Sequence, residues 1–262
     1  MRFVVLPVLL IFVFSCAQQE KPTSISLNNY FTYSDGVESA GIRLIPIQTP
    51  IGEFKVWTKR FGNNPRIKIL LLDGGPAMTH EYMECFESFF QREAFEFYEY
   101  DQLGSYYSDQ PKDSSLWTTE RFVEEVEQVR LAIGADSTNF YVVGNSWGGI
   151  LAMEYALKYQ QHLKGMVVAN MMASAPEYGK YADEVLAKQM KPEVLEEITA
   201  IEAKKDFGNP RYMELLIPHF YREHLCRLEE WPDGFNRAMK HVNGEVYTMM
   251  QGPSEFRISG RL

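Results

Sequence analysis

The sequence predicts an α/β fold with a mainly parallel sheet flanked by helices and a helical insertion near its end. Over residues 41–170, short apolar runs alternate with segments whose apolar residues recur at helical spacing. Several of the runs are continuously apolar, as expected for parallel strands that are buried on both faces. Residues 177–250 keep the helical period and show little strand pattern. Strands that alternate with helices in this way indicate a sheet covered on both sides.

The expected strands and helices follow one another from residue 41 onward. Strands are predicted at residues 41–49, 52–60, 67–72, 95–100, 140–143 and 163–169, and helices at residues 82–92, 118–133 and 148–159. A turn at Pro50-Ile51-Gly52 joins the first two strands. The helix at 118–133 has the clearest pattern, because Phe122, Val126, Val129 and Ile133 recur at helical spacing.

Length and charge limit the possible functions. The chain has 262 residues, of which 45% are hydrophobic, enough for one sizeable core and an inserted subdomain. Its formal net charge is -9 and no basic run is present. Such a chain would repel a phosphate backbone, so no nucleic-acid partner is expected.

The first forty residues differ from the rest. Met1 and Arg2 precede an apolar run over residues 3–14 that is too short to span a bilayer comfortably and is typical of a signal peptide. The following Ser15-Cys16 resembles the lipobox of bacterial lipoproteins, which implies cleavage before Cys16 and lipid attachment to it. Residues 1–16 are then the signal peptide with its lipobox. An ordinary signal peptide with an incidental cysteine is the alternative.

Lipid attachment at Cys16 predicts an exported protein anchored to a membrane of the bacterial envelope. Residues 17–40 are mostly polar and would form a tether between the lipid and the folded part. Cys85 and Cys226 remain, and their spacing shows no disulfide framework. We expect both to be buried free thiols.

The strongest motif is Gly144-Asn145-Ser146-Trp147-Gly148, which lies between a predicted strand and a predicted helix. It matches G-x-S-x-G, in which a sharp strand-to-helix turn lifts the serine hydroxyl above the sheet. Glycine is needed two residues on either side because the turn leaves no room for side chains. Ser146 is therefore the candidate nucleophile, and the Trp147 N–H is a candidate donor to the oxyanion.

A second motif, Asp73-Gly74-Gly75-Pro76-Ala77, follows the third predicted strand. Acyl-transfer hydrolases take their second oxyanion donor from a glycine-rich loop at this place. The N–H of Gly75 is the candidate donor, and a plain strand-to-helix turn is the alternative.

The motifs D-G-G-P at 73–76, D-Q-x-G-S at 101–105 and G-N-S-W-G-G at 144–149 together resemble the proline iminopeptidase family of α/β-hydrolases. Residues 220–224 and 250–256 resemble the cap of that family. The resemblance covers residues 41–262. It implies an α/β-hydrolase core at 41–175, a helical cap at 176–250, and the start of the return to the core at 251–262.

The resemblance implies removal of an N-terminal residue, typically proline, from short peptides by acyl-enzyme chemistry at Ser146. It also implies a Ser-Asp-His triad and no metal or organic cofactor. Cap carboxylates hold the substrate ammonium group in this family, and that role falls on Glu255 and Glu223. The family commonly has histidine in place of Asp73 and glycine in place of Ala77. Asp73 would disfavour the oxyanion unless its carboxyl group is paired or faces away.

The triad acid and histidine follow the strands after the cap in this superfamily. The five histidines are His80, His162, His219, His224 and His241. None follows a strand of that kind, so none is expected to be the base for Ser146. We therefore expect a chain truncated before the last strands, without the triad acid and histidine, and a genuinely short inactive relative is the alternative.

Three functions stay open on the sequence alone. They are a lipid-anchored aminopeptidase, an esterase on the same scaffold, and an inactive binding protein that keeps the pocket. A sheet that lacks its last strands would expose an apolar edge, which predicts poor solubility for the chain.

Overall fold

The computed structural model describes residues 41–262. The predictions of a signal peptide, a lipid on Cys16 and a tether at 17–40 lie outside the described residues. Within residues 41–262, no helix is long and apolar enough to cross a membrane.

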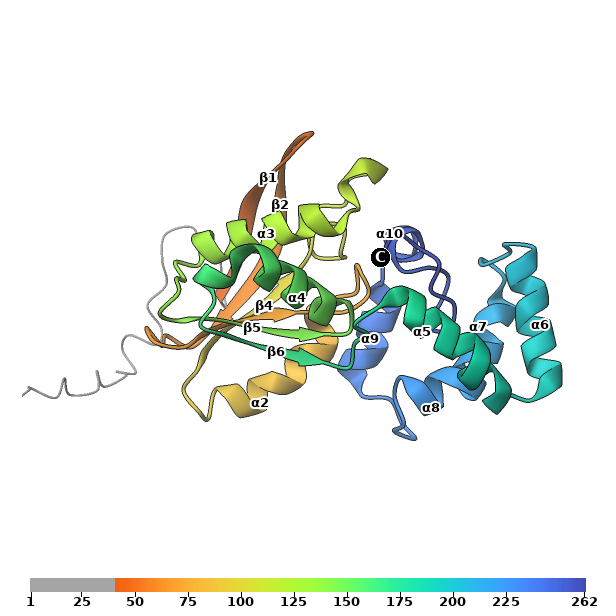
Figure 1. The fold of residues 1–262 in the computed structure, drawn as a ribbon. Helices are drawn as coiled ribbons and strands as arrows, with labels where there is room; N and C mark the ends of the chain where they lie inside the picture. Colours follow the sequence, from red (N-terminus) through yellow and green to blue (C-terminus); the bar gives the residue numbers. More distant parts are fainter. Residues whose placement is uncertain (1–40) are drawn as a thin grey trace, which may run out of the picture.

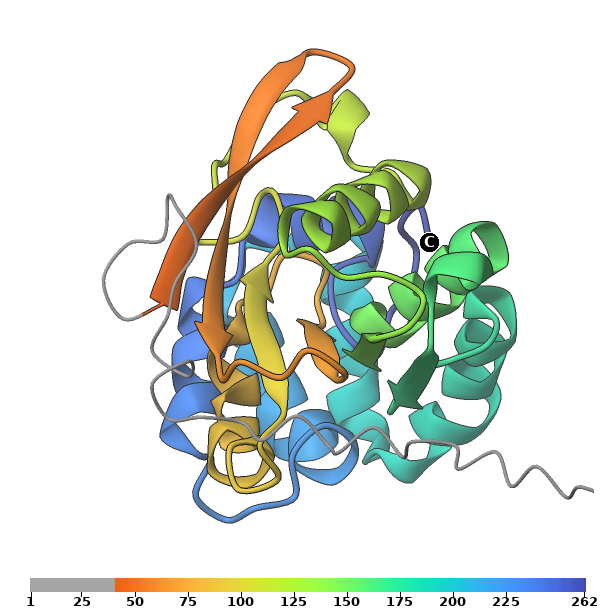
Figure 2. The same cartoon turned by 90° about the vertical axis from the view of Figure 1, so that its left-hand side faces the viewer.

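Six strands form one twisted sheet in the order β1-β2-β4-β3-β5-β6. The strands are β1 (Ile42–Thr49), β2 (Gly52–Phe61), β3 (Lys68–Leu72), β4 (Glu96–Asp101), β5 (Phe140–Asn145) and β6 (Gly165–Ala169). The pairs β4–β3, β3–β5 and β5–β6 are parallel, and the pairs β1–β2 and β2–β4 are antiparallel. The predicted mainly parallel sheet is confirmed, with the hairpin β1–β2 projecting beyond its other strands (Figure 2).

Helices cover the two faces of the sheet (Figure 1). The elements outside the sheet and before residue 165 are η2 (His80–Phe86), α2 (Glu87–Phe90), η3 (Ser114–Leu116), α3 (Thr119–Ala132), α4 (Trp147–Tyr159) and η4 (Gln160–His162). Helix α3 begins where the Thr118 side chain accepts a hydrogen bond from the Arg121 N–H. Its predicted apolar face is buried, because Phe122 and Val126 belong to the same hydrophobic core as Leu70 of β3.

The helix predicted at 82–92 is present over residues 80–90, but it is not one continuous α-helix. The chain forms the 3₁₀ helix η2 and then the four-residue helix α2. Tertiary hydrogen bonds hold the first turn: the His80 N–H and ring bond to Asp101, and the Tyr82 hydroxyl bonds to Gly74 and Asn145. These bonds pull the segment toward the sheet edge and override the helical period of its side chains.

The two remaining cysteines are free thiols, as predicted, but neither is buried. Cys85 is exposed and Cys226 is partly exposed. The reason for Cys85 is the 3₁₀ geometry of η2, whose buried side carries His80, Glu81 and Met83 instead.

Residues 175–250, here called the helical segment, contain helices and connecting loops but no strand. The helices are α5 (Ala175–Tyr181), η5 (Ala182–Leu186), η6 (Ala187–Gln189), α6 (Pro192–Ala203), α7 (Pro210–Leu216), η7 (Ile217–Tyr221), α8 (Arg222–His224), α9 (Asp233–His241) and α10 (Gly244–Met250). The helical segment has its own hydrophobic cluster, built around Ile198, Leu216 and Phe220 and joined by Phe256. It lies beyond the carboxyl ends of the parallel strands (Figures 1 and 2).

A buried carboxylate ties the helical segment to the core. Glu81 of η2 is 1% exposed and lies 2.8 Å from both the Arg237 guanidinium and the His241 ring of α9. Arg237 also pairs with Glu84 at 2.5 Å. The backbone at Gly234 approaches so closely that an added Cβ would lie 2.3 Å from the Glu81 carbonyl oxygen. Helix α9 therefore holds the helical segment over the strand ends.

Strand β6 lies at the edge of the described sheet. Its residues Met166, Val167 and Val168 are 45%, 55% and 37% exposed. Large apolar side chains at these exposures are unusual for a strand of a parallel sheet, which is normally covered on both faces. The predicted apolar edge is present in residues 41–262.

Candidate active site

The turn between β5 and α4 holds Ser146 in a strained conformation, with φ of 53° and ψ of -125°. Positive φ is uncommon for a residue other than glycine, and backbone strain of this kind is frequent at active sites. The Ser146 N–H donates to the Ala169 carbonyl oxygen at 3.0 Å, which anchors the turn to β6. The side chain projects at the carboxyl edge of the sheet, where ligands bind in open α/β folds.

The two flanking glycines are required by close backbone contacts. A Cβ on Gly144 would lie 2.1 Å from the Gly148 carbonyl oxygen, and a Cβ on Gly148 would lie 2.0 Å from the Leu72 carbonyl oxygen. Both distances are far below van der Waals contact. The folded turn therefore leaves no room for a side chain at either position, as predicted from the motif.

The glycine-rich loop after β3 lies against the serine. A Cβ on Gly74 would be 3.0 Å from the Ser146 Cβ. The N–H of Gly74 donates to the Tyr82 hydroxyl at 2.7 Å, and this hydroxyl donates to the Asn145 side-chain oxygen at 3.0 Å. Tyr82 thus links the loop to the residue before the serine. No sequence motif pointed to Tyr82.

Two backbone N–H groups remain for an oxyanion. In the described part of the chain, the N–H groups of Gly75 and Trp147 have no hydrogen-bond acceptor. The Ser146 hydroxyl has no hydrogen-bond partner there either. Gly75 adopts a φ of 113°, which favours glycine. One N–H group lies in the loop after β3 and the other at the start of α4, and their role as oxyanion donors stays a prediction.

The Asp73 carboxyl group is paired and lies inside the protein. Its Oδ1 accepts a hydrogen bond from Gln102 Nε2 at 2.9 Å, and the residue has no exposed surface. Burial, together with the neighbouring Asp101, raises the pKa of Asp73 well above the ordinary value. The neutral acid is therefore favoured at Asp73, which lessens the negative charge beside the candidate oxyanion donors.

Ser146 lies on the wall of two adjoining cavities. One, of about 340 Å³, has mainly apolar walls from the helical segment. The other, of about 630 Å³, is more polar. The residues common to both are Asn145, Ser146, Leu225 and Glu255. The fold therefore brings Ser146 and Glu255, which are 109 positions apart in sequence, to the same space.

Glu255 follows α10, and its carboxyl group lies in this space without an ion-pair partner among the described residues. It accepts hydrogen bonds from the Tyr247 hydroxyl at 2.5 Å and from Gln251 Nε2 at 3.2 Å. Neither donor is cationic, and burial raises the pKa of Glu255. Glu223 differs, because it is exposed and lines the larger cavity only. Among the residues that line the smaller cavity, Glu255 is the one acidic residue.

The histidines mostly lie elsewhere. Three rings face carboxylates: His80 faces Asp101, His162 faces Glu127 and His241 faces Glu81. His224 lines the larger cavity, and no histidine of residues 41–262 is hydrogen-bonded to Ser146. That none of these histidines is the base for Ser146 stays a prediction.

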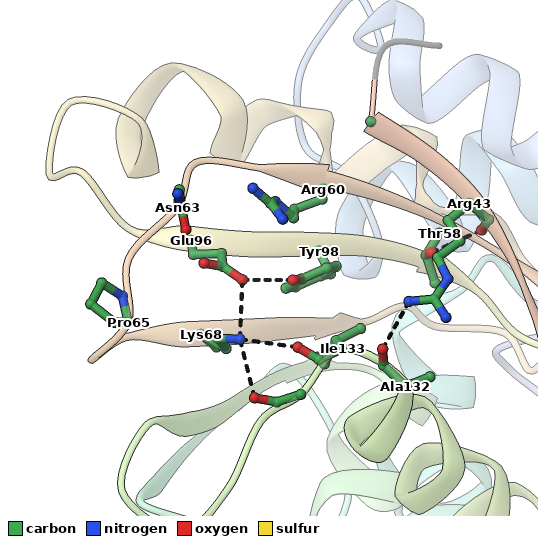
Figure 3. Close-up of a pocket in the computed structure, with 12 residues that line it drawn as sticks. Arg43, Thr58, Arg60, Asn63, Pro65, Lys68, Glu96, Tyr98, Ala132 and Ile133 are labelled. Carbon is green, nitrogen blue, oxygen red and sulfur yellow. Dashed lines mark hydrogen bonds and ion pairs between the residues drawn. The ribbon is translucent and has the colours of Figure 1, made fainter. Parts of the chain in front are cut away.

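Another pocket, of about 330 Å³, lies at the amino ends of the parallel strands (Figure 3). Its charged groups hold the end of α3 against the sheet. Lys68 lies 3.6 Å from the Glu96 carboxylate and donates to the Ile133 carbonyl oxygen at 3.0 Å, while Arg43 donates to the Ala132 carbonyl oxygen at 2.8 Å. None of the predicted site residues lies there. The catalytic candidates all lie at the opposite ends of the strands.

Comparison with known proteins agrees with this geometry. Residues 68–241 match the family model described as alpha/beta hydrolase fold. The chain is 83% identical over 219 residues to a proline iminopeptidase of Flavobacterium johnsoniae, which covers 84% of this chain and 74% of that protein. It is 76% identical over 216 residues to a proline iminopeptidase of Elizabethkingia meningoseptica, covering 82% and 72% of the two chains.

Solved structures show the same likeness. The crystal structure of VinJ matches with a TM-score of 0.75 at 29% identity, and covers 83% of this chain and 74% of that chain. The crystal structure of proline iminopeptidase from Mycobacterium smegmatis matches with a TM-score of 0.69 at 28% identity, with the same coverage. The fold, the serine turn and these relatives together place the chain in the proline iminopeptidase family of serine hydrolases with the α/β-hydrolase fold.

Proposed function

We propose that this protein is an aminopeptidase that releases an N-terminal residue, proline or a similar one, from short peptides. The observation that carries the proposal is the placement of Ser146 and the Glu255 carboxyl group on the wall of one cavity of about 340 Å³. The relatives named proline iminopeptidase support the same reaction.

The reaction follows from the site. The Ser146 oxygen attacks the carbonyl carbon of the first residue, and the N–H groups of Gly75 and Trp147 bind the oxygen that becomes negative. As the C–N bond breaks, the proton given up by the Ser146 hydroxyl passes to the nitrogen, so the shortened peptide leaves as an amine and the first residue stays as an ester on Ser146. Water hydrolyses the resulting ester, which releases the first residue and restores the serine.

Glu255 makes the enzyme specific for the chain terminus. An exopeptidase must recognise one residue from the end, and pairing of a carboxylate with the free ammonium group achieves this. The walls of the smaller cavity include Phe207, Met213 and Phe235, which suit an apolar first residue such as proline. We assign Glu223 an auxiliary part in the same recognition, because it lines the adjoining cavity that also contains Glu255.

The test compares a free and a blocked N-terminus. Prolyl anilide is expected to be hydrolysed and N-acetylprolyl anilide is not, because the blocked substrate lacks the ammonium group. Glu255→Gln is expected to raise KM for prolyl anilide about 10- to 100-fold, because the substrate loses one charge-assisted hydrogen bond. Glu245→Gln, on the exposed side of α10, is the matched control and should leave KM unchanged.

The same variant has a pH signature. Only the carboxylate form of Glu255 pairs with an ammonium group, and burial raises the pKa of Glu255. KM is therefore expected to fall as the pH rises through this pKa, and Glu255→Gln should lack that fall. Equal KM values for Glu255→Gln and the wild type, or hydrolysis of the blocked substrate, would contradict the assignment.

We further propose that the protein is an exported lipoprotein of a bacterial envelope, anchored through Cys16. The support is the basic start, the short apolar run and the Ser15-Cys16 pair. Cys16→Ser is expected to move the protein from the membrane fraction to the soluble fraction of expressing cells. Cys85→Ser, which removes an exposed thiol, is the control. Membrane recovery of the Cys16→Ser variant would refute the lipid anchor.

A further inference from the structure

A three-residue bridge joins the two loops that supply the oxyanion donors. Asp73 begins the glycine-rich loop, Gln102 follows β4, and Trp147 begins α4. Gln102 Nε2 donates to Asp73 Oδ1 at 2.9 Å, and Gln102 Oε1 accepts from Trp147 Nε1 at 2.8 Å. The three residues are 0%, 0% and 1% exposed. Solvent therefore does not compete for these hydrogen bonds.

The indole decides how the Gln102 amide is oriented. A tryptophan N–H is a donor only, so the oxygen of the Gln102 amide must face Trp147. The NH₂ group must then face Asp73, where it also lies 3.3 Å from the Asp73 carbonyl oxygen. The amide bonds the side chain and the main chain of Asp73 at once, which fixes the first residue of the loop relative to Trp147.

The surroundings of Asp73 favour the neutral acid. Asp101, the nearest buried acid, already accepts hydrogen bonds from the His80 N–H and ring at 2.7 and 2.8 Å. The other titratable neighbours are the buried hydroxyls of Tyr82 and Tyr100, which bring no positive charge. Asp73 Oδ2 and Asp101 Oδ2 are both buried without a partner. A proton on Asp73 removes the repulsion between the two carboxyl groups.

A second set of charges lies behind Tyr100. Its hydroxyl bonds to Glu125 of α3, and Glu125 pairs with Arg121. Glu125 and Arg121 are both buried, and their opposite charges neutralise each other. This pair therefore leaves Asp73 without a cationic partner, so neither β4 nor α3 offers a counterion to an Asp73 carboxylate.

We propose that Asp73 and Gln102 are positioning residues, which hold the Trp147 N–H and the Gly75 N–H at the separation that the oxyanion requires. They touch neither substrate nor the reacting atoms. Asp73 takes part as a hydrogen-bond acceptor that carries no charge, so it holds the loop without weakening the field of the two donors. The inference rests on the proposed hydrolysis at Ser146 and extends it to the support of the oxyanion site.

The test is nuclear magnetic resonance on the full chain, which needs no turnover. The chain has four indole N–H groups, and the Trp147→Phe variant identifies the one of interest. The carboxyl carbon that disappears in Asp73→Asn is expected to resonate at neutral pH where a protonated acid does. Gln102→Met, which keeps the side-chain length without hydrogen bonds, should speed solvent exchange of the Trp147 indole N–H on the order of tenfold.

Charge and hydrogen bonding are separated by the Asp73→Asn variant. Asparagine keeps a neutral acceptor, so its Trp147 indole resonance should stay at the wild-type position. Gln128→Met, which changes an amide on the outer side of α3, should leave the resonance in place as well. An ionised Asp73 carboxyl at neutral pH would overturn the proposal. So would a shift in Asp73→Asn as large as that in Gln102→Met.

Kinetics provide a readout that a purely structural role would not give. In protein that hydrolyses prolyl anilide, Gln102→Met is expected to lower kcat about 10- to 100-fold and to leave KM within about twofold. Unchanged kcat with a displaced Trp147 resonance would overturn the positioning role alone. Absence of hydrolysis in every variant, including the wild type, would count against the proposed function and leave the resonance test intact.

Discussion

Replacement of Ser146 by alanine is expected to lower hydrolysis of prolyl anilide by about 10⁴-fold or more. The variant loses the atom that forms the acyl-enzyme, while the cavity and the oxyanion donors remain. Water would have to attack the amide directly, and the residual rate would reflect binding and the oxyanion donors alone.

The measurement is the initial rate with prolyl anilide, together with urea unfolding of the same preparations. The Ser146 hydroxyl has no hydrogen-bond partner within residues 41–262, so its loss should change the free energy of unfolding little. Ser115→Ala, in η3, is a serine control whose rate should match the wild type. More than about 1% of the wild-type rate in Ser146→Ala would exclude Ser146 as the nucleophile, since removal of a nucleophilic serine lowers the rate far more than 100-fold.

Replacement of Gly148 by alanine is expected to have the largest effect on stability. The added Cβ would lie 2.0 Å from the Leu72 carbonyl oxygen and 2.7 Å from the Asp73 carbonyl oxygen. Both are backbone atoms at the end of β3, so no change of rotamer relieves the clash. Helix α4 would have to move away from the sheet, which should cost about 3 kcal/mol or more in the free energy of unfolding.

Urea denaturation measures this cost, and Gly179→Ala is the matched control. Gly179 lies within α5, and a Cβ there would meet no atom within 4 Å. Alanine at that position is expected to stabilise the protein by up to about 1 kcal/mol, because glycine is a poor helix former. A Gly148→Ala variant within about 1 kcal/mol of the wild type would show that the contact with β3 is not rigid.

Local patterns were sufficient for the sheet and the serine turn. The strand at 140–143, the glycines around Ser146 and the helix after it are neighbours in sequence, and their geometry depends on steric limits within a few residues. The apolar face of α3 could be predicted for the same reason, since Phe122, Val126 and Val129 recur at the helical period of about 3.6 residues. Family motifs added Gly75 and Glu255 as candidates.

Patterns failed where long-range hydrogen bonds act on a short segment. The first part of the helix expected at 82–92 is a 3₁₀ helix and only residues 87–90 are α-helical, because Tyr82 bonds to Gly74 and Asn145 across the sheet edge. The burial expected for Cys85 was wrong for the same reason. The periodicity of apolar residues depends only on neighbours along the chain, so it does not reveal these long-range contacts.

The sequence by itself determined the order of strands and helices along the chain and the glycine-dependent turn at Ser146, and it made Gly75 and Trp147 candidate oxyanion donors. Only the tertiary structure decided that Glu255 shares a cavity with Ser146, and that Gln102 joins Asp73 to Trp147. The turn follows from steric constraints between adjacent residues. The shared cavity and the bridge depend on where separate elements pack, which no local pattern encodes.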